Sequence, residues 1–149
     1  MLSHEPRYSA NRAALPPPID ERTRTVLARE LILNTVTTVF DVEAELILLR
    51  TRGKASAALA RQVAMYLAHV GCELSLTAVG RMFERDRTTV AHACRRIEDA
   101  RERPEFDRAV GMMERSVRAI VRTSAALRRD LERAEAHVTG EPVAEGETQ

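Results

Sequence analysis

The stretch that most constrains the fold runs from Leu74 to Ile97 and reads LSLTAVGRMFERDRTTVAHACRRI. Ser75 and Asp86 each precede a run with apolar residues at helical spacing. Side chains of these types accept hydrogen bonds from the free N–H groups of a first helical turn. The pattern predicts a short helix after Ser75, a tight polar turn, and a second helix after Asp86. Two short helices joined in this way are typical of a helix-turn-helix.

The second of these helices is amphipathic. Its apolar residues recur on one side, and they are Val90, Ala93, Cys94 and Ile97. The opposite side has no carboxylate and consists of Thr88, Thr89, His92, Arg95 and Arg96. A recognition helix needs one face for anchoring and one with donors for base edges and phosphates. The alternative is a solvated polar face on a structural helix.

The segment ERDRTTVAHACRRI resembles the signature of domain IV, the C-terminal DNA-binding domain of the bacterial replication initiator DnaA, which is close to GGRDHTTVxHAxRKI. Upstream, ARQVAMYLAHVGCELSLTAVGRMF is similar to the ARQ-A-MYL…LSL-x-x-IG-x-x-F stretch of that domain. The resemblance covers roughly residues 26–121. It implies an all-helical fold and binding to double-stranded DNA. The residues themselves offer no metal constellation, so we expect no cofactor or metal.

The resemblance also implies which residues contact DNA. The positions that the family uses at the major groove correspond here to Leu76, Thr77, Arg85, Asp86, Arg87, Thr88, Thr89, His92 and Arg96. A basic loop of the family places an arginine in the minor groove, where a narrow A/T-rich groove concentrates negative potential. Arg52 is the best candidate for that role. The other minor-groove or phosphate candidates are Arg50, Lys54, Arg61, Gln62 and Arg95. An ordinary solvated turn is the alternative for this loop.

Three positions depart from the family pattern. Arg87 stands where the family has histidine, and its guanidinium can take two acceptors of a guanine, or a phosphate. The usual GGRD turn is shortened to Glu84-Arg85-Asp86, and Thr77 replaces a common proline. These departures bear on the preferred DNA sequence more than on binding to double-stranded DNA.

The rest of the chain predicts an all-α protein with one small domain. We expect a disordered arm over residues 1–19, the DNA-binding domain over 20–123, an extension of the last helix over 124–136, and a disordered acidic tail over 137–149. A first helix begins after the cap Asp20 and runs to about Phe40. Its expected buried positions are Ala28, Ile32, Val36, Val39 and Phe40, with Leu27 and Leu31 beside them.

Three further helices complete this prediction. A short helix over residues 43–49 has Leu46, Ile47 and Leu49 inward. Ser56 caps the next helix, and Gly71 ends it. A long final helix starts at Pro104 and covers Glu105 to about Ala136. Its apolar positions are Phe106, Val110, Met113, Val117, Ile120, Val121, Leu127 and Leu131.

Composition limits the function classes. The 23 Lys and Arg residues nearly balance the 22 Asp and Glu residues, but Arg50 to Arg103 carries an excess of basic residues. The two cysteines, Cys72 and Cys94, lack metal or redox spacing and suit a core in a reducing cytosol. We expect a cytoplasmic, nucleoid-associated protein without a signal peptide or membrane span. No catalytic constellation is visible, so we expect no enzyme.

The leading hypothesis is a free-standing protein that resembles DnaA domain IV, occupies DnaA-box-like sites and modulates replication initiation or transcription, with DnaA as a competitor. There is no GxxxxGK[ST] phosphate loop, so we do not expect it to initiate replication by itself. One alternative is a transcription regulator with its own site. Another is a helical interaction module that no longer binds DNA. Leu127 and Leu131 suggest a weak homodimer seam, or else a helix end that frays in solvent.

Overall fold

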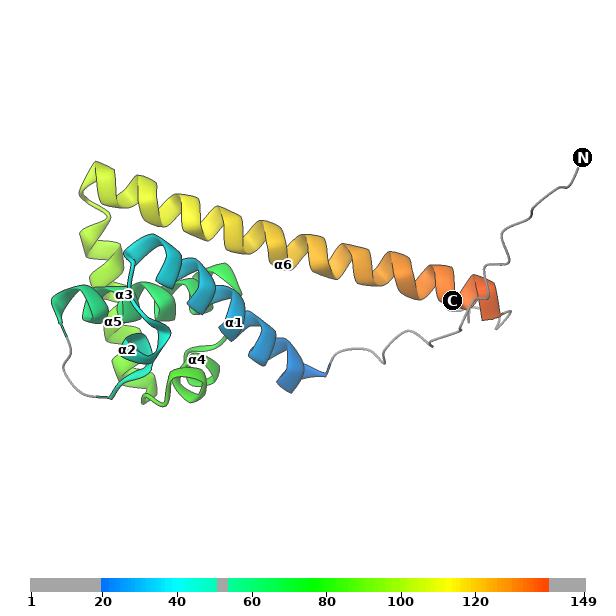
Figure 1. Ribbon diagram of the computed structural model, residues 1–149, viewed down its shortest axis with the longest axis horizontal. Coiled ribbons are helices and arrows are strands. Elements are labelled where there is room, and N and C mark those ends of the chain that lie inside the picture. The colour runs from blue at the N-terminus through cyan, green and yellow to red at the C-terminus, as the bar shows by residue number, and fades with distance from the viewer. Residues whose placement is uncertain (1–19, 51–53, 140–149) are drawn as a thin grey trace, which may run out of the picture.

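The computed structural model describes residues 20–50 and 54–139, and every regular element in these ranges is helical. The elements are α1 (Glu21–Phe40), α2 (Ala44–Leu48), α3 (Ala55–Tyr66), the π-helical turn η1 (Leu67–Gly71), α4 (Leu76–Phe83), α5 (Arg87–Ala100) and α6 (Pro104–Thr139). The predicted all-α class with a long last helix is confirmed (Figure 1). The predicted disordered arm and most of the acidic tail lie outside the described residues. Within these residues, none of the helices has the length and apolar character needed to cross a membrane.

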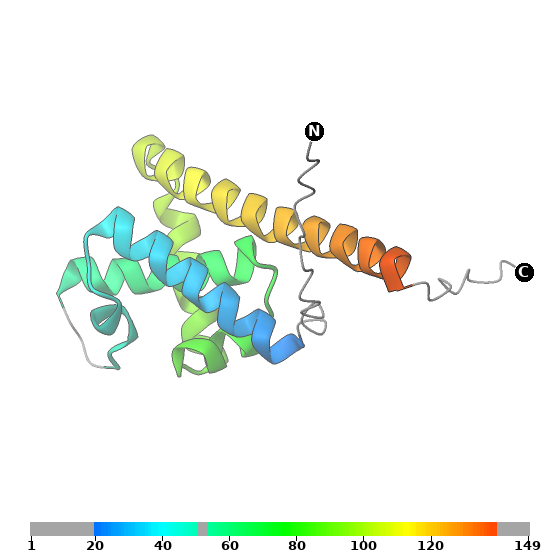
Figure 2. The same cartoon turned by 45° about the vertical axis from the view of Figure 1, so that its right-hand side comes forward.

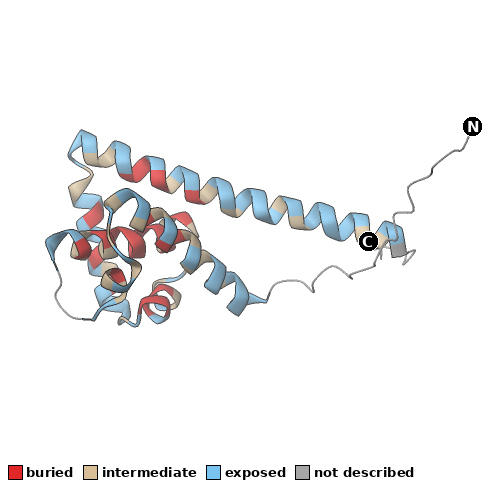
Figure 3. Ribbon diagram, viewed as in Figure 1, coloured by how far each residue is buried: buried red, intermediate tan, exposed pale blue. Residues whose placement is uncertain are grey.

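The core is built around α3 and η1. Every residue from Val63 to Ala68 is buried, and α1, α2 and α5 all pack against α3, while α6 packs against η1 (Figure 3). A helix buried on so many sides needs small and apolar residues all round, as AALARQVAMYLA provides. The predicted cap at Ser56 is wrong: α3 begins at Ala55 after Lys54, and no side-chain hydrogen bond caps it.

Helix α1 begins as predicted, because Asp20 accepts a hydrogen bond from the N–H of Thr23 at 2.6 Å. Its β-branched threonines are accommodated by bonds back to the preceding turn, as from Thr38 Oγ1 to the Asn34 carbonyl at 2.7 Å. Ile32, Leu33 and Val36 are the buried residues of this helix. The predicted burial of Val39 is wrong, since its side chain is 53% exposed.

One predicted contact of α2 differs in the structure, whereas the predicted helix end at Gly71 is confirmed. In α2, Ile47 is buried but Leu49 is 44% exposed, because the helix stops at Leu48 and Leu49 leaves it with extended backbone. Gly71 is the last residue of η1, and its role is close packing. A Cβ at this position would lie 3.1 Å from Cγ1 of Val117 in α6, so the glycine allows α6 to approach.

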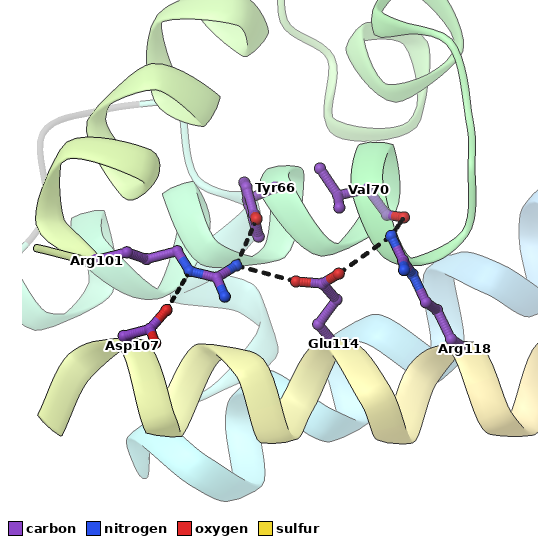
Figure 4. A network of polar contacts seen from close by, with 6 residues as sticks. All are labelled: Tyr66, Val70, Arg101, Asp107, Glu114 and Arg118. Atoms are coloured by element: carbon purple, nitrogen blue, oxygen red, sulfur yellow. Dashed lines mark hydrogen bonds and ion pairs between the residues drawn. The ribbon is translucent and has the colours of Figure 1, made fainter. Parts of the chain in front are cut away.

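Ion pairs attach α6 to the core (Figure 4). Arg101 donates from Nε to Asp107 at 2.6 Å, and from Nη1 to the Tyr66 hydroxyl at 2.7 Å and to Glu114 at 3.0 Å. The hydrogen bond with Asp107 is the main cause of a raised Arg101 pKa. Arg118 binds the other oxygen of Glu114 at 3.1 Å. The first half of α6 is therefore fixed, while its second half extends past the other helices (Figures 1 and 2).

Candidate DNA-binding site

The predicted division of α5 into two faces is confirmed. The residues facing the core are buried: Val90, Ala93, Cys94 and Ile97. The residues on the other side are exposed, and they are Arg87, Thr88, Thr89, His92, Arg95 and Arg96. Burial raises the pKa of the Cys94 thiol to about 11, which fits a cysteine that packs in the core. From Arg87 to Arg96 the exposed face of α5 therefore presents hydroxyls, an imidazole and guanidinium groups, and the exposed carboxylates of Glu98 and Asp99 follow in the last turn.

The turn between α4 and α5 depends on a close backbone approach. The N–H of Arg85 donates to the carbonyl of Gly80 at 2.8 Å. A Cβ on Gly80 would lie 2.6 Å from the Arg85 carbonyl oxygen, so this position requires glycine. Glu84 ends α4 in the left-handed conformation with φ 53°, a conformation that costs a non-glycine residue about 1 kcal/mol. The shortened turn thus closes with a glutamate where the family pattern has glycine.

Both predicted caps of the helix-turn-helix are confirmed. The N–H of Ala78 donates to Ser75 Oγ at 3.1 Å at the start of α4. Asp86 Oδ1 accepts from the Thr89 N–H at 2.7 Å, and its Oδ2 accepts from the Thr89 hydroxyl at 2.9 Å. These hydrogen bonds lower the pKa of Asp86. The first turn of α5 is therefore held by a charged carboxylate that already has two partners.

Arg61 and Arg85 have partners within the domain. Arg61 donates from Nε to the carbonyl of Ile47 at 2.6 Å and from Nη2 to that of Leu46 at 2.9 Å. Arg85 donates to the carbonyl of Leu49 at 2.6 Å, and more weakly to that of Arg50 at 3.4 Å. Positive charge at a helix C-terminus satisfies free carbonyls and suits the helix dipole. The two arginines thus join the end of α2 to α3 and to the helix-turn-helix.

The sequence gives no signal for this arrangement, because the contacts join residues 14 to 36 positions apart. Arg61 loses hydration at this site, and this burial, followed by the positive charge of Arg85, lowers the pKa of Arg61. Two half-buried like charges are tolerated side by side here because carbonyl oxygens accept hydrogen bonds from both. Both residues were expected to contact DNA. The structure shows them supporting the segment from which the basic loop departs.

A hollow of about 300 Å³ brings seven of the fifteen candidate residues together. It lies between α3, the turn and α5. Its polar lining consists of Arg50, Arg61, Gln62, Glu84, Arg85, Asp86, Thr89 and His92. Glu84 is the member that was not among the predicted contact residues, and its carboxylate lowers the positive charge at this point. Lys54 is exposed at the start of α3, whereas Arg52 lies outside the described residues.

The remaining candidates lie along α4 and α5, beside the hollow. Thr77 is exposed in the first turn of α4, and Leu76 is half-buried. Arg95 and Arg96 continue the exposed face of α5 toward its C-terminus. The candidate residues therefore come from the end of α2, the start of α3, the start of α4 and the length of α5. This surface is concave at its centre and is rich in donors.

Comparison with known proteins gives a consistent result. Residues 29–97 match the family described as the bacterial DnaA protein helix-turn-helix. The chain is 36% identical over 100 residues to chromosomal replication initiator protein DnaA 1 of Protochlamydia amoebophila, covering 66% of this chain and 22% of that protein. It is 43% identical over 74 residues to DnaA 2 of Chlamydia trachomatis serovar D, covering 50% and 16%.

A solved structure supports the same relationship. A crystal structure of a DNA replication initiation factor superposes with a TM-score of 0.60 at 34% identity, covering 68% of this chain and 31% of that chain. The chain spans about a fifth of the length of the curated relatives it matches. The similarity therefore concerns the helix-turn-helix region and not the remainder of those proteins.

Proposed function

Because residues 29–97 carry a helix-turn-helix that resembles that of bacterial DnaA, we propose that this chain binds double-stranded DNA at DnaA-box-like sites. It would act at the nucleoid and modulate replication initiation or transcription, in part by competing with DnaA. The observation that carries the proposal is the exposed face of α5 from Arg87 to Arg96, which has three arginines, two threonines and a histidine, with exposed carboxylates only in the last turn of the helix, at Glu98 and Asp99. Such a face suits the acceptor-rich major groove and its flanking phosphates.

In this proposal α5 lies in the major groove. Arg87, Thr88 and His92 contact base edges, while Arg95 and Arg96 contact phosphates. Phosphate contacts supply most of the affinity, and base contacts supply the specificity. Thr89 has a smaller role, because its hydroxyl donates to Asp86. Leu76 and Thr77 approach thymine methyl groups from α4.

The basic segment around Arg50, Arg52 and Lys54 contacts the minor groove or its phosphates. Arg61 and Arg85 act chiefly by positioning, because their guanidinium groups hold the carbonyls at the end of α2. Gln62 lines the same hollow as His92 and would contact a phosphate at its edge.

One set of observations favours a second candidate, a regulator with its own DNA site. Arg87 is fully outside the core at the start of α5, and Glu84 lines the hollow. Arginine reads guanine N7 and O6 as a pair of acceptors, which histidine does not. A glutamate carboxylate near the DNA backbone repels the phosphates. Both departures from the family pattern, Arg87 and Glu84, lie in the part of the protein that would contact the bases of the DNA site.

Fluorescence anisotropy on duplexes with a DnaA box or a scrambled sequence tests the proposal. We expect the box to bind more tightly, and we expect Arg87→Ala to weaken binding to the box by about 1–3 kcal/mol. Arg129→Ala is the matched control, because Arg129 is exposed on α6. Salt-sensitive binding without preference would favour the second candidate and call for selection from random DNA. An absence of binding at low salt would refute both and favour an interaction module.

A further inference from the structure

Helix α6 carries one apolar stripe that runs nearly its full length. Its positions alternate at spacings of three and four residues, and they are Val110, Met113, Val117, Ile120, Ser124, Leu127, Leu131, Ala134 and Val138, of which only Ser124 is polar. This is the spacing of the a and d positions of a coiled coil. The stripe is therefore regular well beyond the part that the domain uses.

Burial divides the stripe into two halves. Val110, Met113 and Val117 are buried against the domain, with exposed fractions of 0 to 5%. Leu127, Leu131 and Val138 are 58%, 53% and 71% exposed. The exposed half lies on the part of α6 that extends past the other helices (Figure 3). The same face that packs on the core is thus presented to solvent further along.

We propose that this distal stripe pairs with the distal stripe of a second copy of the chain, in antiparallel orientation. The pairing is centred between Glu132 and Arg133. It places Leu131 against Ala134 of the second copy, and Leu127 against Val138 of the second copy. Each contact occurs twice, because a twofold dimer has a self-complementary interface.

The charges beside the stripe favour this orientation. In the antiparallel register Arg128 faces Glu135 of the second copy, and Asp130 faces His137 of the second copy. Asp130 also contacts Arg133 of its own helix at 3.5 Å. In a parallel pair, the interaction between flanking positions would instead bring Asp130 against Glu135, two like charges.

The position of the domain also opposes a parallel pair. The stripe from Val110 to Val117 is covered by the helices of its own chain. In a parallel pair these covered parts of the two α6 helices would face each other, and both domains would need the space between them. In the antiparallel pair each domain lies beyond the C-terminal end of the other α6.

The size of the contact predicts a weak dimer. The paired helices overlap over about 14 residues, or about 21 Å at 1.5 Å per residue. Two helices that overlap over so short a length bury an area at the low end for protein interfaces. The dissociation constant of the dimer is therefore expected in the micromolar range or above. The two Val117 positions would be about 45 Å apart along the helices. If the proposed DNA binding holds, the dimer would engage two sites and gain affinity through avidity.

Sedimentation velocity of the full chain, from about 1 to 500 µM, tests the pairing. We expect dimer to form with rising concentration. Leu131→Asp should raise the dissociation constant at least about a hundredfold, because both copies lose a buried leucine and gain a charge. Ala125→Asp, at an exposed position beside the stripe, should change it little. Circular dichroism and binding to a single DNA site report whether Leu131→Asp stays folded and active.

A wild-type chain that stays monomeric throughout, or an equal loss in both variants, would overturn the proposal. The orientation has its own test. Arg128→Glu should weaken the dimer about tenfold, since two ion pairs become two repulsions, and adding Glu135→Arg should restore it. In a parallel pair Arg128 faces Thr123, so an unchanged dimer in Arg128→Glu would refute the antiparallel register.

Discussion

Replacing Arg61 with methionine separates a structural role from a DNA-contacting role. Methionine keeps the aliphatic stem but removes the donors to the carbonyls of Ile47 and Leu46, which are 2.6 and 2.9 Å away. A hydrogen bond from a charged group contributes about 1.5–3 kcal/mol when its partner is left buried and unpaired. Arg61 is only half-buried, so in the variant water can replace part of the lost hydrogen bonding to these carbonyls. We expect Arg61→Met to lower the free energy of unfolding by about 2–3 kcal/mol.

The assay pairs urea unfolding with the salt dependence of DNA binding. Arg96→Met is the matched control, because Arg96 is exposed on α5. It should change stability by less than about 0.5 kcal/mol but reduce the slope of log K against log salt by about 0.9. Arg61→Met should leave that slope nearly unchanged. The positioning role of Arg61 would be refuted if Arg61→Met kept the wild-type stability and instead reduced the slope of log K against log salt.

Two further changes test the helix-turn-helix itself. Gly80→Ala should lower the free energy of unfolding by at least about 1 kcal/mol, because its Cβ would lie 2.6 Å from the Arg85 carbonyl oxygen. In Gly111→Ala the new Cβ would meet only flexible side-chain ends, those of Arg115 at 3.2 Å and Arg101 at 3.7 Å, so the free energy of unfolding in urea should instead rise by about 0.5–1 kcal/mol; equal effects of the two changes would contradict the packing of the turn. The pKa of Asp86 is lowered by its bonds to Thr89, so its stabilisation is present above the ordinary aspartate pKa and is lost as pH falls through the lower folded value. Asp86→Ala should therefore be less stable than wild type at pH 7 but converge with it in acid, and a constant difference down to pH 2 would speak against the cap.

Local sequence signals predicted the helices well where a cap or a strict period was present. Asp20, Ser75 and Asp86 each cap a helix as expected, because an N-cap bond joins residues only three apart. The two faces of α5 were also predictable, since a helical period is a property of one short segment. The cap at Ser56 and the burial of Leu49 were mispredicted because the local sequence does not fix a helix end to within one residue. It is equally compatible with a helix that begins at Ala55 and with one that ends at Leu48.

What the sequence determined by itself is therefore local: the all-helical class, the helix-turn-helix with its caps, and the donor-rich face of α5. Tertiary structure decided the roles of Arg61 and Arg85, because their carbonyl partners come from distant positions of the chain. It also decided where the stripe of α6 is covered, since one pattern of three- and four-residue spacings is buried up to Val117 and exposed from Ile120 onward. A periodic sequence defines the face of a helix, whereas only the packing of the other helices determines how much of that face is buried.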